Sequence, residues 1–166
     1  MDQLWAPWRL AYVTKAAQPK ADQCFICSAL ATSNDRKNLV ALRTSRSVVM
    51  LNRFPYNNGH LLIAPQAHKG RLEELDGEEL LDGLDIVRQM VKLLEQLILA
   101  EGFNIGLNLG KAAGAGLPGH LHWHVVPRWN GDTNFMPVLG DVKVIAQSLD
   151  ALWVILTGQL TQDKNA

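Results

Sequence analysis

Three histidines at alternate positions, His120, His122 and His124, are the residues of this sequence with the clearest capacity for chemistry. If they lie on a β-strand, their side chains all point to one face and the apolar residues between them point to the other. A row of imidazoles supports two kinds of catalysis. Either two or three rings hold a metal ion that activates water, or one ring attacks phosphorus while its neighbours orient it and protonate the leaving oxygen. Purely structural histidines are the less favoured alternative.

The segment before the histidines favours phosphorus chemistry. It reads Asn108-Leu-Gly-Lys-Ala-Ala-Gly-Ala-Gly116 and leads directly into the histidine row. Its small residues allow backbone N–H groups to approach a phosphate closely. A glycine-rich loop alone is typical of many turns, but beside three histidines it indicates a site for the phosphate chain of a nucleotide.

The strands that would position these residues can be predicted from apolar runs and turn signals. Residues 103–109 and 120–126 are predicted strands, joined by the glycine-rich connection 110–119, and Pro127 is expected to end the second strand. This pair of strands would form the chemical centre.

A hairpin is predicted earlier in the chain. Apolar, β-branched residues at 48–52 and apolar residues at 60–64 flank the turn-forming stretch 54–59.

A long helix is predicted over 76–100. Asp76 followed by Glu79 is a helix-start signature, and Gly102 is expected to stop the helix. Apolar residues recur at helical spacing in between: Leu80, Leu81, Leu84, Val87, Val91, Leu94 and Ile98. Such a stripe serves either the core or a dimer interface, and the core is favoured.

The ends of the chain differ from each other. Residues 1–23 carry Trp5, Trp8 and Tyr12 with little periodicity, which indicates an irregular aromatic arm. Asp141 is predicted to cap a last helix over about 141–160, with Val144, Ile145, Leu149, Leu152 and Leu156 on its apolar face. Strands, a helix, strands and a helix together predict an α+β fold with a mostly antiparallel sheet.

Length and charge restrict the class of protein. The 166 residues fit one compact domain spanning 1–166. Sixteen Lys and Arg balance sixteen Asp and Glu, so no excess positive field attracts nucleic acid or a membrane surface, and neither is expected as a partner. The N-terminus does not resemble a signal peptide and no apolar run reaches the roughly 20 residues of a membrane span, so we expect a cytoplasmic protein.

The two cysteines, Cys24 and Cys27, form a close pair. In the cytoplasm such a pair indicates metal or redox chemistry before a structural disulfide, and two buried thiols are the remaining alternative.

These motifs resemble those of the histidine triad (HIT) superfamily of nucleotide hydrolases and transferases. The run His120-Leu-His-Trp-His-Val-Val126 fits the family's alternating histidines followed by two apolar residues. The stretch Leu51-Asn-Arg-Phe-Pro-Tyr-Asn-Asn-Gly-His-Leu-Leu-Ile-Ala-Pro65 is similar to the family's first nucleotide-binding hairpin. The resemblance covers about residues 24–135. It implies a HIT-like fold of about five strands with a long central helix and a C-terminal helix, and a homodimer.

Two outer segments refine the resemblance. Leu4-Trp-Ala-Pro-Trp-Arg9 and Val126-Pro-Arg-Trp-Asn-Gly-Asp-Thr-Asn-Phe-Met136 are similar to a bacterial branch associated with diadenosine tetraphosphate phosphorylase or hydrolase activity. Within the second segment, Arg128 and Trp129 either reach the outer phosphates or a second base, or simply anchor the loop.

The resemblance also implies roles for individual residues. His122 would take up the nucleotidyl group, with His124 and His60 hydrogen-bonding around the α-phosphate. The remaining nucleotide contacts would be Asn108 and His120 to phosphate, the Ala115, Gly116 and Leu117 backbone as a phosphate cradle, Asn52 to the ribose hydroxyls, and Met50 and Leu51 in the base pocket. For Asn52, a turn-forming role is the alternative.

The same resemblance implies a structural zinc site. Its ligands would be Cys24, Cys27, His68 and His120, a closed Cys₂His₂ set that staples the N-terminal segment to the histidine strand. No catalytic metal is required of the protein, and a divalent ion would arrive with the substrate.

The expected function is that of an enzyme cleaving dinucleoside polyphosphates, diadenosine tetraphosphate foremost, through a nucleotidyl intermediate on His122. The alternatives are a purine nucleoside phosphoramidase, and a nucleotide-binding or zinc-dependent scaffold with little turnover. The loop Gly114-Ala-Gly-Leu-Pro-Gly-His120 lacks the Ser, Thr or Gln that often contacts the leaving side of the phosphate in this family. Whether water or inorganic phosphate resolves the intermediate therefore stays open.

Overall fold

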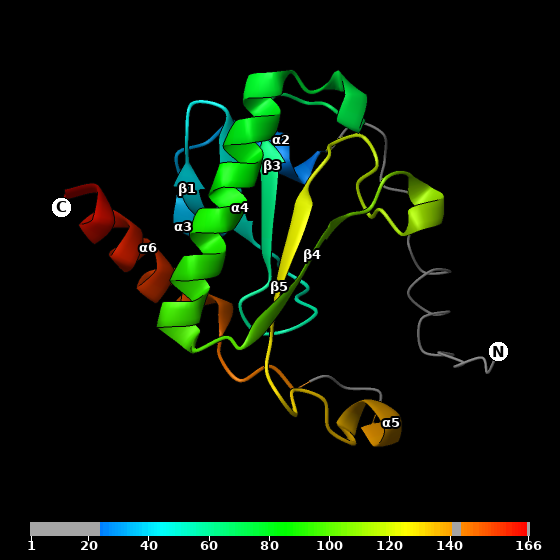
Figure 1. Ribbon diagram of the computed structural model, residues 1–166, viewed down its shortest axis with the longest axis vertical. Helices are drawn as coiled ribbons and strands as arrows, with labels where there is room; N and C mark the ends of the chain where they lie inside the picture. Colours follow the sequence, from blue (N-terminus) through cyan, green and yellow to red (C-terminus); the bar gives the residue numbers. More distant parts are fainter. Residues whose placement is uncertain (1–23, 141–143, 166) are drawn as a thin grey trace.

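One five-stranded antiparallel sheet organises the protein. The computed structural model describes residues 24–140 and 144–165 (Figure 1). The strand order is β1-β2-β3-β5-β4, with bounds Val40–Arg43, Ser47–Leu51, Leu61–Pro65, Trp123–Arg128 and Gly102–Leu107 in that order. The α+β prediction with a mostly antiparallel sheet is confirmed. The predicted N-terminal arm lies outside the described residues.

The predicted hairpin forms the middle of the sheet. β2 and β3 pair from Ser47 opposite Pro65 to Leu51 opposite Leu61, and every residue of both strands is buried. They are covered on both faces: α4 (Gly77–Ile98) packs on one and the short helix α2 (Phe25–Leu30) on the other.

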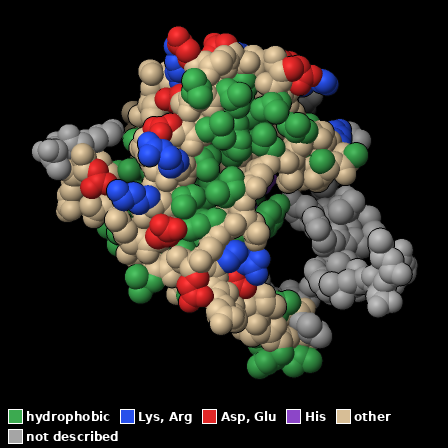
Figure 2. Space-filling model, viewed as in Figure 1, with side chains coloured by type: hydrophobic (Ala, Val, Ile, Leu, Met, Phe, Trp, Pro, Cys, Tyr) green, Lys and Arg blue, Asp and Glu red, His purple; other side chains and the backbone are tan. Residues whose placement is uncertain are grey.

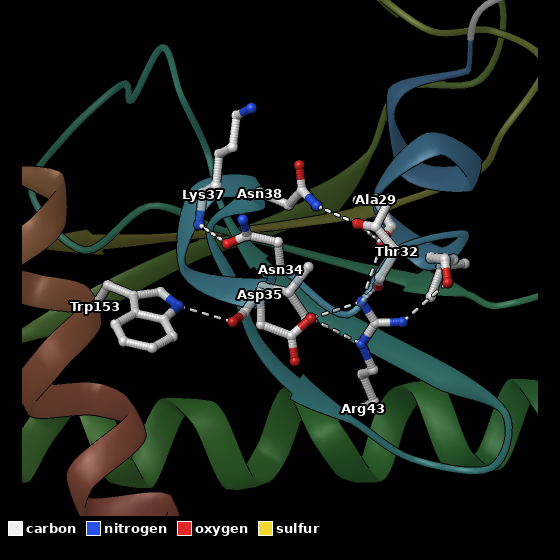
Figure 3. Close-up of polar contacts among 10 residues, drawn as sticks. Ala29, Thr32, Asn34, Asp35, Lys37, Asn38, Arg43 and Trp153 are labelled. Carbon is white, nitrogen blue, oxygen red and sulfur yellow. Dashed lines mark hydrogen bonds and ion pairs between the residues drawn. The ribbon is translucent and has the colours of Figure 1, made fainter.

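Strand β1 was not predicted as a separate element. It follows the short helix α3 (Asp35–Asn38), and Arg43 at its end ties the surrounding segments together (Figure 3). The Arg43 guanidinium donates to the carbonyl oxygens of Ala29 and Thr32 at 3.0 and 2.8 Å and pairs with the Asp35 carboxylate at 2.6 Å. One cation thereby fixes α2 relative to the sheet, which matters because α2 begins at the cysteine pair.

Helix α4 confirms the predicted start and corrects the predicted end. Asp76 and Glu79 form a reciprocal capping box at its N-terminus. The helix ends at Ile98 because Leu99 adopts a left-handed conformation with φ 52°, whereas Gly102 is the first residue of β4. Its apolar stripe is mainly core, since Val87 and Leu94 are buried, but Leu81 and Leu84 are 70% and 47% exposed.

A glycine lets α4 approach β5 closely. A Cβ atom at Gly83 would lie 2.9 Å from the Trp123 ring, so the ring packs directly on the helix backbone. Trp123 thus anchors the face of β5 opposite the histidines.

Strand β5 is displaced from its predicted position. It runs from Trp123 to Arg128, so His120 and His122 precede the strand and Pro127 lies inside it. Pro127 is tolerated because pairing with β3 ends at Val125, and the Pro127 carbonyl accepts instead from the Asn57 side chain at 3.1 Å. The proline's missing N–H would face that same side, so no ladder hydrogen bond is lost.

The C-terminal helix begins later than predicted. The short helix α5 (Met136–Gly140) comes first, and α6 runs from Leu149 to Asn165, so 144–148 are not helical. Ser148 Oγ accepts from the Ala151 N–H at 3.2 Å and caps α6, whereas Asp141 lies outside the described residues. None of the described helices is long and apolar enough to cross a membrane.

Helix α6 is fastened to the sheet edge. Leu152 and Leu156 are buried in the main core. Trp153 Nε1 donates to the Val40 carbonyl oxygen at 2.7 Å (Figure 3). The helix thereby covers β1 beside α4 (Figure 1).

Candidate functional site

Two neighbouring strands bring three histidines together. His122 directly precedes β5, His124 lies within it, and His60 directly precedes β3, which pairs with β5 through Leu62 opposite His124. The ring centroids of His122 and His124 lie 5.0 Å apart, and those of His60 and His124 lie 5.2 Å apart. The structure therefore brings the three predicted catalytic histidines into one cluster.

A backbone hydrogen bond decides which nitrogen of His122 is available. Its Nδ1 lies 2.8 Å from the His120 carbonyl oxygen, which can only accept, so Nδ1 carries the hydrogen. The lone pair of the neutral ring is then on Nε2. Burial lowers the pKa of His122 below its ordinary value, more than this hydrogen bond raises it, so the ring is neutral at pH 7. This is the form that a nucleophile requires.

His60 and His124 form a directed chain of hydrogen bonds. The Tyr56 backbone N–H donates to His60 Nδ1 at 3.0 Å, so the hydrogen of a neutral His60 is on Nε2. That nitrogen lies 2.9 Å from His124 Nδ1 and donates to it, which leaves the hydrogen of His124 on Nε2. Burial, with a smaller contribution from the charge of His122, lowers the pKa of His124 to about 4. His124 is therefore a neutral hydrogen-bond donor.

The histidines open onto a pocket of about 210 Å³. His122 and His124 form one wall, and the backbone of the glycine-rich loop forms another through Gly114, Gly116 and Leu117. A second, mainly apolar pocket of about 270 Å³ adjoins it. The two share four lining residues: Phe25, Asn52, Phe54 and Leu62. The arrangement can hold an apolar ring system in one compartment and a phosphate in the other.

The predicted phosphate-binding residues of the loop differ in whether they line the histidine pocket. Gly116 and Leu117 line the histidine pocket, whereas Ala115 is buried and its N–H donates to the Gly110 carbonyl oxygen at 3.2 Å. The Asn108 amide lies 3.4 Å from His124 Nε2. Because an amide can present its oxygen or its nitrogen at one place, Asn108 can accept the Nε2 hydrogen.

Asn52 makes the predicted turn contact and also lines both pockets. Its Oδ1 accepts from the Phe54 N–H at 3.0 Å, the predicted turn contact, and its Nδ2 lies 3.2 Å from His60 Nδ1. It also lines both pockets, next to Met50 and Leu51 of the apolar compartment.

Three aromatic residues that line the pockets were not predicted as site residues: Phe25, Phe54 and Tyr56. Phe25, from α2, lines both pockets, and its only sequence signal is its position between the two cysteines. Tyr56 lines the histidine pocket and packs its ring against His60 and His124. In the sequence it was one residue of a turn.

The predicted metal ligands form a second cluster. One ligand atom from each of Cys24, Cys27, His68 and His120 lies within 4.8 Å of the others. Cys24 Sγ is 3.2 Å from His120 Nδ1, and Cys27 Sγ is 3.2 Å from His68 Nδ1. Ligands of tetrahedral zinc are separated by roughly 3.3–3.8 Å, given Zn–S and Zn–N bonds of about 2.3 and 2.0 Å.

Hydrogen bonding and charge around this cluster fit a cation. His120 Nε2 donates to the Pro65 carbonyl oxygen at 2.8 Å, so its Nδ1 lone pair faces the two sulfurs. Burial and the neighbouring Cys24 raise the pKa of the Cys27 thiol, so a pair of thiolates here needs a positive charge between them. His120 is fully buried, with both ring nitrogens engaged, and does not line the histidine pocket.

Arg128 and Trp129 anchor the loop that follows β5. The Arg128 guanidinium makes two contacts with Asp132, at 2.5 and 2.9 Å, and holds the pKa of that carboxyl far below its usual range. Trp129 Nε1 donates to the Leu99 carbonyl oxygen at 2.8 Å, at the end of α4. Both residues therefore make the contacts expected of a loop anchor.

Comparison with known proteins shows the family to which this chain belongs. The family model described as HIT domain matches residues 34–131. The chain is 35% identical over 154 residues to the AP-4-A phosphorylase of Mycobacterium tuberculosis, covering 90% of this chain and 79% of that protein. It is 37% identical over 93 residues to the asymmetrical bis(5'-nucleosyl)-tetraphosphatase of Schizosaccharomyces pombe, covering 56% of this chain and 50% of that protein.

Solved structures support the fold. A zinc-bound histidine triad family protein from Mycobacterium smegmatis superposes with a TM-score of 0.68 at 22% identity, covering 86% of this chain and 96% of that one. Plasmodium falciparum diadenosine triphosphate hydrolase superposes with a TM-score of 0.62 at 22% identity, covering 75% and 77% of the two chains.

Proposed function

The chain belongs to the HIT family and is a nucleotidyl hydrolase or transferase, and we propose that it cleaves dinucleoside polyphosphates, diadenosine tetraphosphate foremost, through a nucleotidyl intermediate on His122. One observation carries the proposal. The His120 carbonyl oxygen holds the Nδ1 hydrogen of His122, which leaves the Nε2 lone pair for attack beside a pocket lined by the glycine-rich loop. The similarity to AP-4-A phosphorylase supports the substrate class.

In the first step, His122 Nε2 forms a bond to the α-phosphorus as the bond from that phosphorus to the bridging oxygen breaks. The bridging oxygen leaves with the electron pair on the polyphosphate tail. The Nε2–H of His124 donates a hydrogen bond to the developing charge. The His120 carbonyl oxygen keeps the Nδ1 hydrogen, and so stabilises the positive ring that carries the nucleotidyl group.

In the second step, water or inorganic phosphate attacks the same phosphorus and the bond to His122 breaks, which restores the neutral ring. The neutral state of His124 favours a polyphosphate tail over an amine as leaving group. A polyphosphate leaves as a stable anion and needs only a hydrogen bond, whereas an amine must take a full proton.

Binding is assigned to the two compartments. We assign the nucleobase to the apolar pocket, against Met50, Leu51 and Phe25, and the ribose hydroxyls to Asn52. We assign the α-phosphate to His124, Asn108 and the backbone of Gly116 and Leu117. Ala115 supports this loop through its own hydrogen bond to Gly110.

We assign a structural zinc ion to Cys24, Cys27, His68 and His120, and no phosphate contact to His120. When bound, zinc in a closed Cys₂His₂ set supplies stability rather than a reactive water. The proposed zinc site is connected to the histidine pocket at two points. Phe25 stands between the cysteine ligands, and His120 accepts the Nδ1 hydrogen of His122 through its backbone. The cysteine thiols also agree with a cytoplasmic location.

A homodimer is part of the proposal. Within residues 24–140 and 144–165, β4 is the last strand of the sheet and pairs with β5 only, which offers an edge for another strand. Hydrophobic side chains gather on the face over α4 and β4 (Figure 2), and Leu81, Leu84 and Ile105 are 70%, 47% and 48% exposed. A second copy would cover these apolar side chains.

The test is product analysis by ion-exchange chromatography after incubation with diadenosine tetraphosphate, with and without inorganic phosphate. ADP plus ATP formed only with phosphate identifies a phosphorylase, and AMP plus ATP formed without it identifies a hydrolase. Absence of turnover in both samples from folded protein would contradict the proposal and favour the phosphoramidase or the binding scaffold.

A further inference from the structure

The ring of Tyr56 lies against the histidine chain from the side of the pocket. Tyr56 belongs to the turn between β2 and β3 and is 44% exposed. Its ring stacks on His124 with a centroid distance of 5.7 Å and an interplanar angle of 19°, and it is tilted against His60 at 4.6 Å. One residue therefore contacts both imidazoles that stand behind the nucleophile.

Hydrogen bonds alone leave the plane of His124 incompletely fixed. Its Nδ1 is held by His60 at 2.9 Å and its Nε2 lies 3.4 Å from the Asn108 amide, but hydrogen bonds at the two ring nitrogens still permit the ring to rotate about the line that joins them. The two ring neighbours complete the restraint: Tyr56 stacks on His124, and His122 meets it nearly edge-on at 5.0 Å and 64°. Aromatic pairs of this kind contribute orientation beyond the area they bury.

We propose that Tyr56 is a positioning residue, whose ring holds His124 in the plane that directs its Nε2–H at the leaving oxygen. This inference rests on the proposed function and adds a residue to it. The backbone of Tyr56 fixes the tautomer of His60, and the side chain fixes the orientation of His124.

The turn provides a way to separate the ring from the backbone. Asn52 Oδ1 holds the Phe54 N–H at one end of the turn, and Asn57 Nδ2 donates to the Pro127 carbonyl oxygen and to Asp132 at the other. These contacts do not involve the Tyr56 side chain. A substitution at Tyr56 therefore removes the ring while the backbone N–H to His60 is kept.

Phe54 supplies a matched control. It belongs to the same turn, lines the same pocket and is 78% exposed. Among the described residues it has no ring contact with a histidine, unlike Tyr56. Phe54→Leu should therefore leave the orientation of His124 unchanged.

The experiment measures kcat and KM for diadenosine tetraphosphate in Tyr56→Phe, Tyr56→Leu and Phe54→Leu. Tyr56→Phe keeps the stacked ring, so its kcat should be several-fold above that of Tyr56→Leu. Tyr56→Leu should lower kcat about tenfold with KM within about twofold, because misorientation of a catalytic group acts on the transition state. Unchanged kcat in Tyr56→Leu, or a raised KM with unchanged kcat, would overturn the proposal.

A spectroscopic measurement is independent of turnover. Long-range ¹H–¹⁵N correlation of the histidine rings in ligand-free protein should give a single neutral Nε2–H form of His124 in wild type, Tyr56→Phe and Phe54→Leu. In Tyr56→Leu the tautomer should be the same, because the backbone N–H of residue 56 still holds His60. Carbon relaxation dispersion of the His124 ring should instead show exchange between ring orientations in Tyr56→Leu and none in the other three proteins. Relaxation equal to wild type in Tyr56→Leu would contradict the positioning role. Wild-type protein without turnover would refute the proposed function, while the spectra would still decide the role of Tyr56.

Discussion

The metal cluster and the catalytic cluster both contain a histidine that is held by a backbone carbonyl, but through different ring nitrogens. In the metal cluster, His120 gives its Nε2 hydrogen to a backbone carbonyl and turns Nδ1 toward two sulfurs. In the cleft, His122 gives its Nδ1 hydrogen to a backbone carbonyl and leaves the Nε2 lone pair for the pocket. The backbone partner of one ring nitrogen thus determines what the other nitrogen can do.

The clusters also differ in what surrounds the remaining nitrogen. Burial lowers the pKa of both His120 and His122, so both rings are held neutral. His120 is fully buried against Cys24, Cys27 and the Pro65 carbonyl oxygen and is a proposed ligand of a structural metal ion, whereas His122 faces a space that a substrate can enter. One substitution in each cluster, one substitution in the scaffold that the clusters share and a change of pH test this division. Their expected effects decrease in that order.

His122→Ala should lower kcat by at least about 10³-fold, because it removes the proposed nucleophile. Nucleotide binding, measured by calorimetry with AMP, should stay within about threefold of wild type, since the assigned base and ribose contacts remain. Zinc content should be unchanged. Turnover equal to wild type would show that His122 is not the nucleophile.

Cys24→Ser should remove the metal and lower stability. Elemental analysis should give one zinc per wild-type chain and little in the variant. At zinc 1,000-fold above its Kd the loss is about 4 kcal/mol, or roughly 8–16 °C in Tm for a chain of this size. Metal-replete wild-type protein without zinc would disprove the assigned site.

Gly83→Ala tests the scaffold that both clusters share. An added Cβ would lie 2.9 Å from the Trp123 ring, so overpacking should lower the free energy of unfolding by about 1–3 kcal/mol. Gly77→Ala, whose Cβ would meet nothing within 4 Å, is the control and should be neutral or stabilising. Denaturant unfolding measures both. Equal stability of the two variants would show that the close packing of α4 on β5 carries no energetic weight.

The smallest effect concerns pH. The proposed mechanism requires neutral His124, and the neutral form is lost as the pH falls through the pKa in the folded protein. Because burial lowers that pKa to about 4, this loss is displaced to lower pH. We expect kcat/KM at pH 5.5 to stay within about twofold of its value at pH 7.5, whereas a histidine with a pKa of about 6.5 would lose most of its neutral form. A tenfold fall over this range would show that the cleft does not shield its histidines.

Local pattern was sufficient for the longest elements and insufficient at their ends. The hairpin and α4 were predicted because continuous apolar runs around a turn and a capping box are local signals. The end of α4 was wrong because Leu99 takes a left-handed conformation that a glycine was expected to take. The end of β5 was wrong because Pro127 is tolerated only where β3 has stopped, and this depends on a strand far away in the sequence.

By itself, the sequence determined that His122 and His124 lie close together after a glycine-rich loop, because residue spacing and glycine content are properties of a single segment. Only the tertiary structure decided which nitrogen of each ring is available, that Arg128 pairs with Asp132, and that Phe25 and Tyr56 line the histidine pocket. These depend on contacts between segments distant in the sequence, which local pattern does not encode.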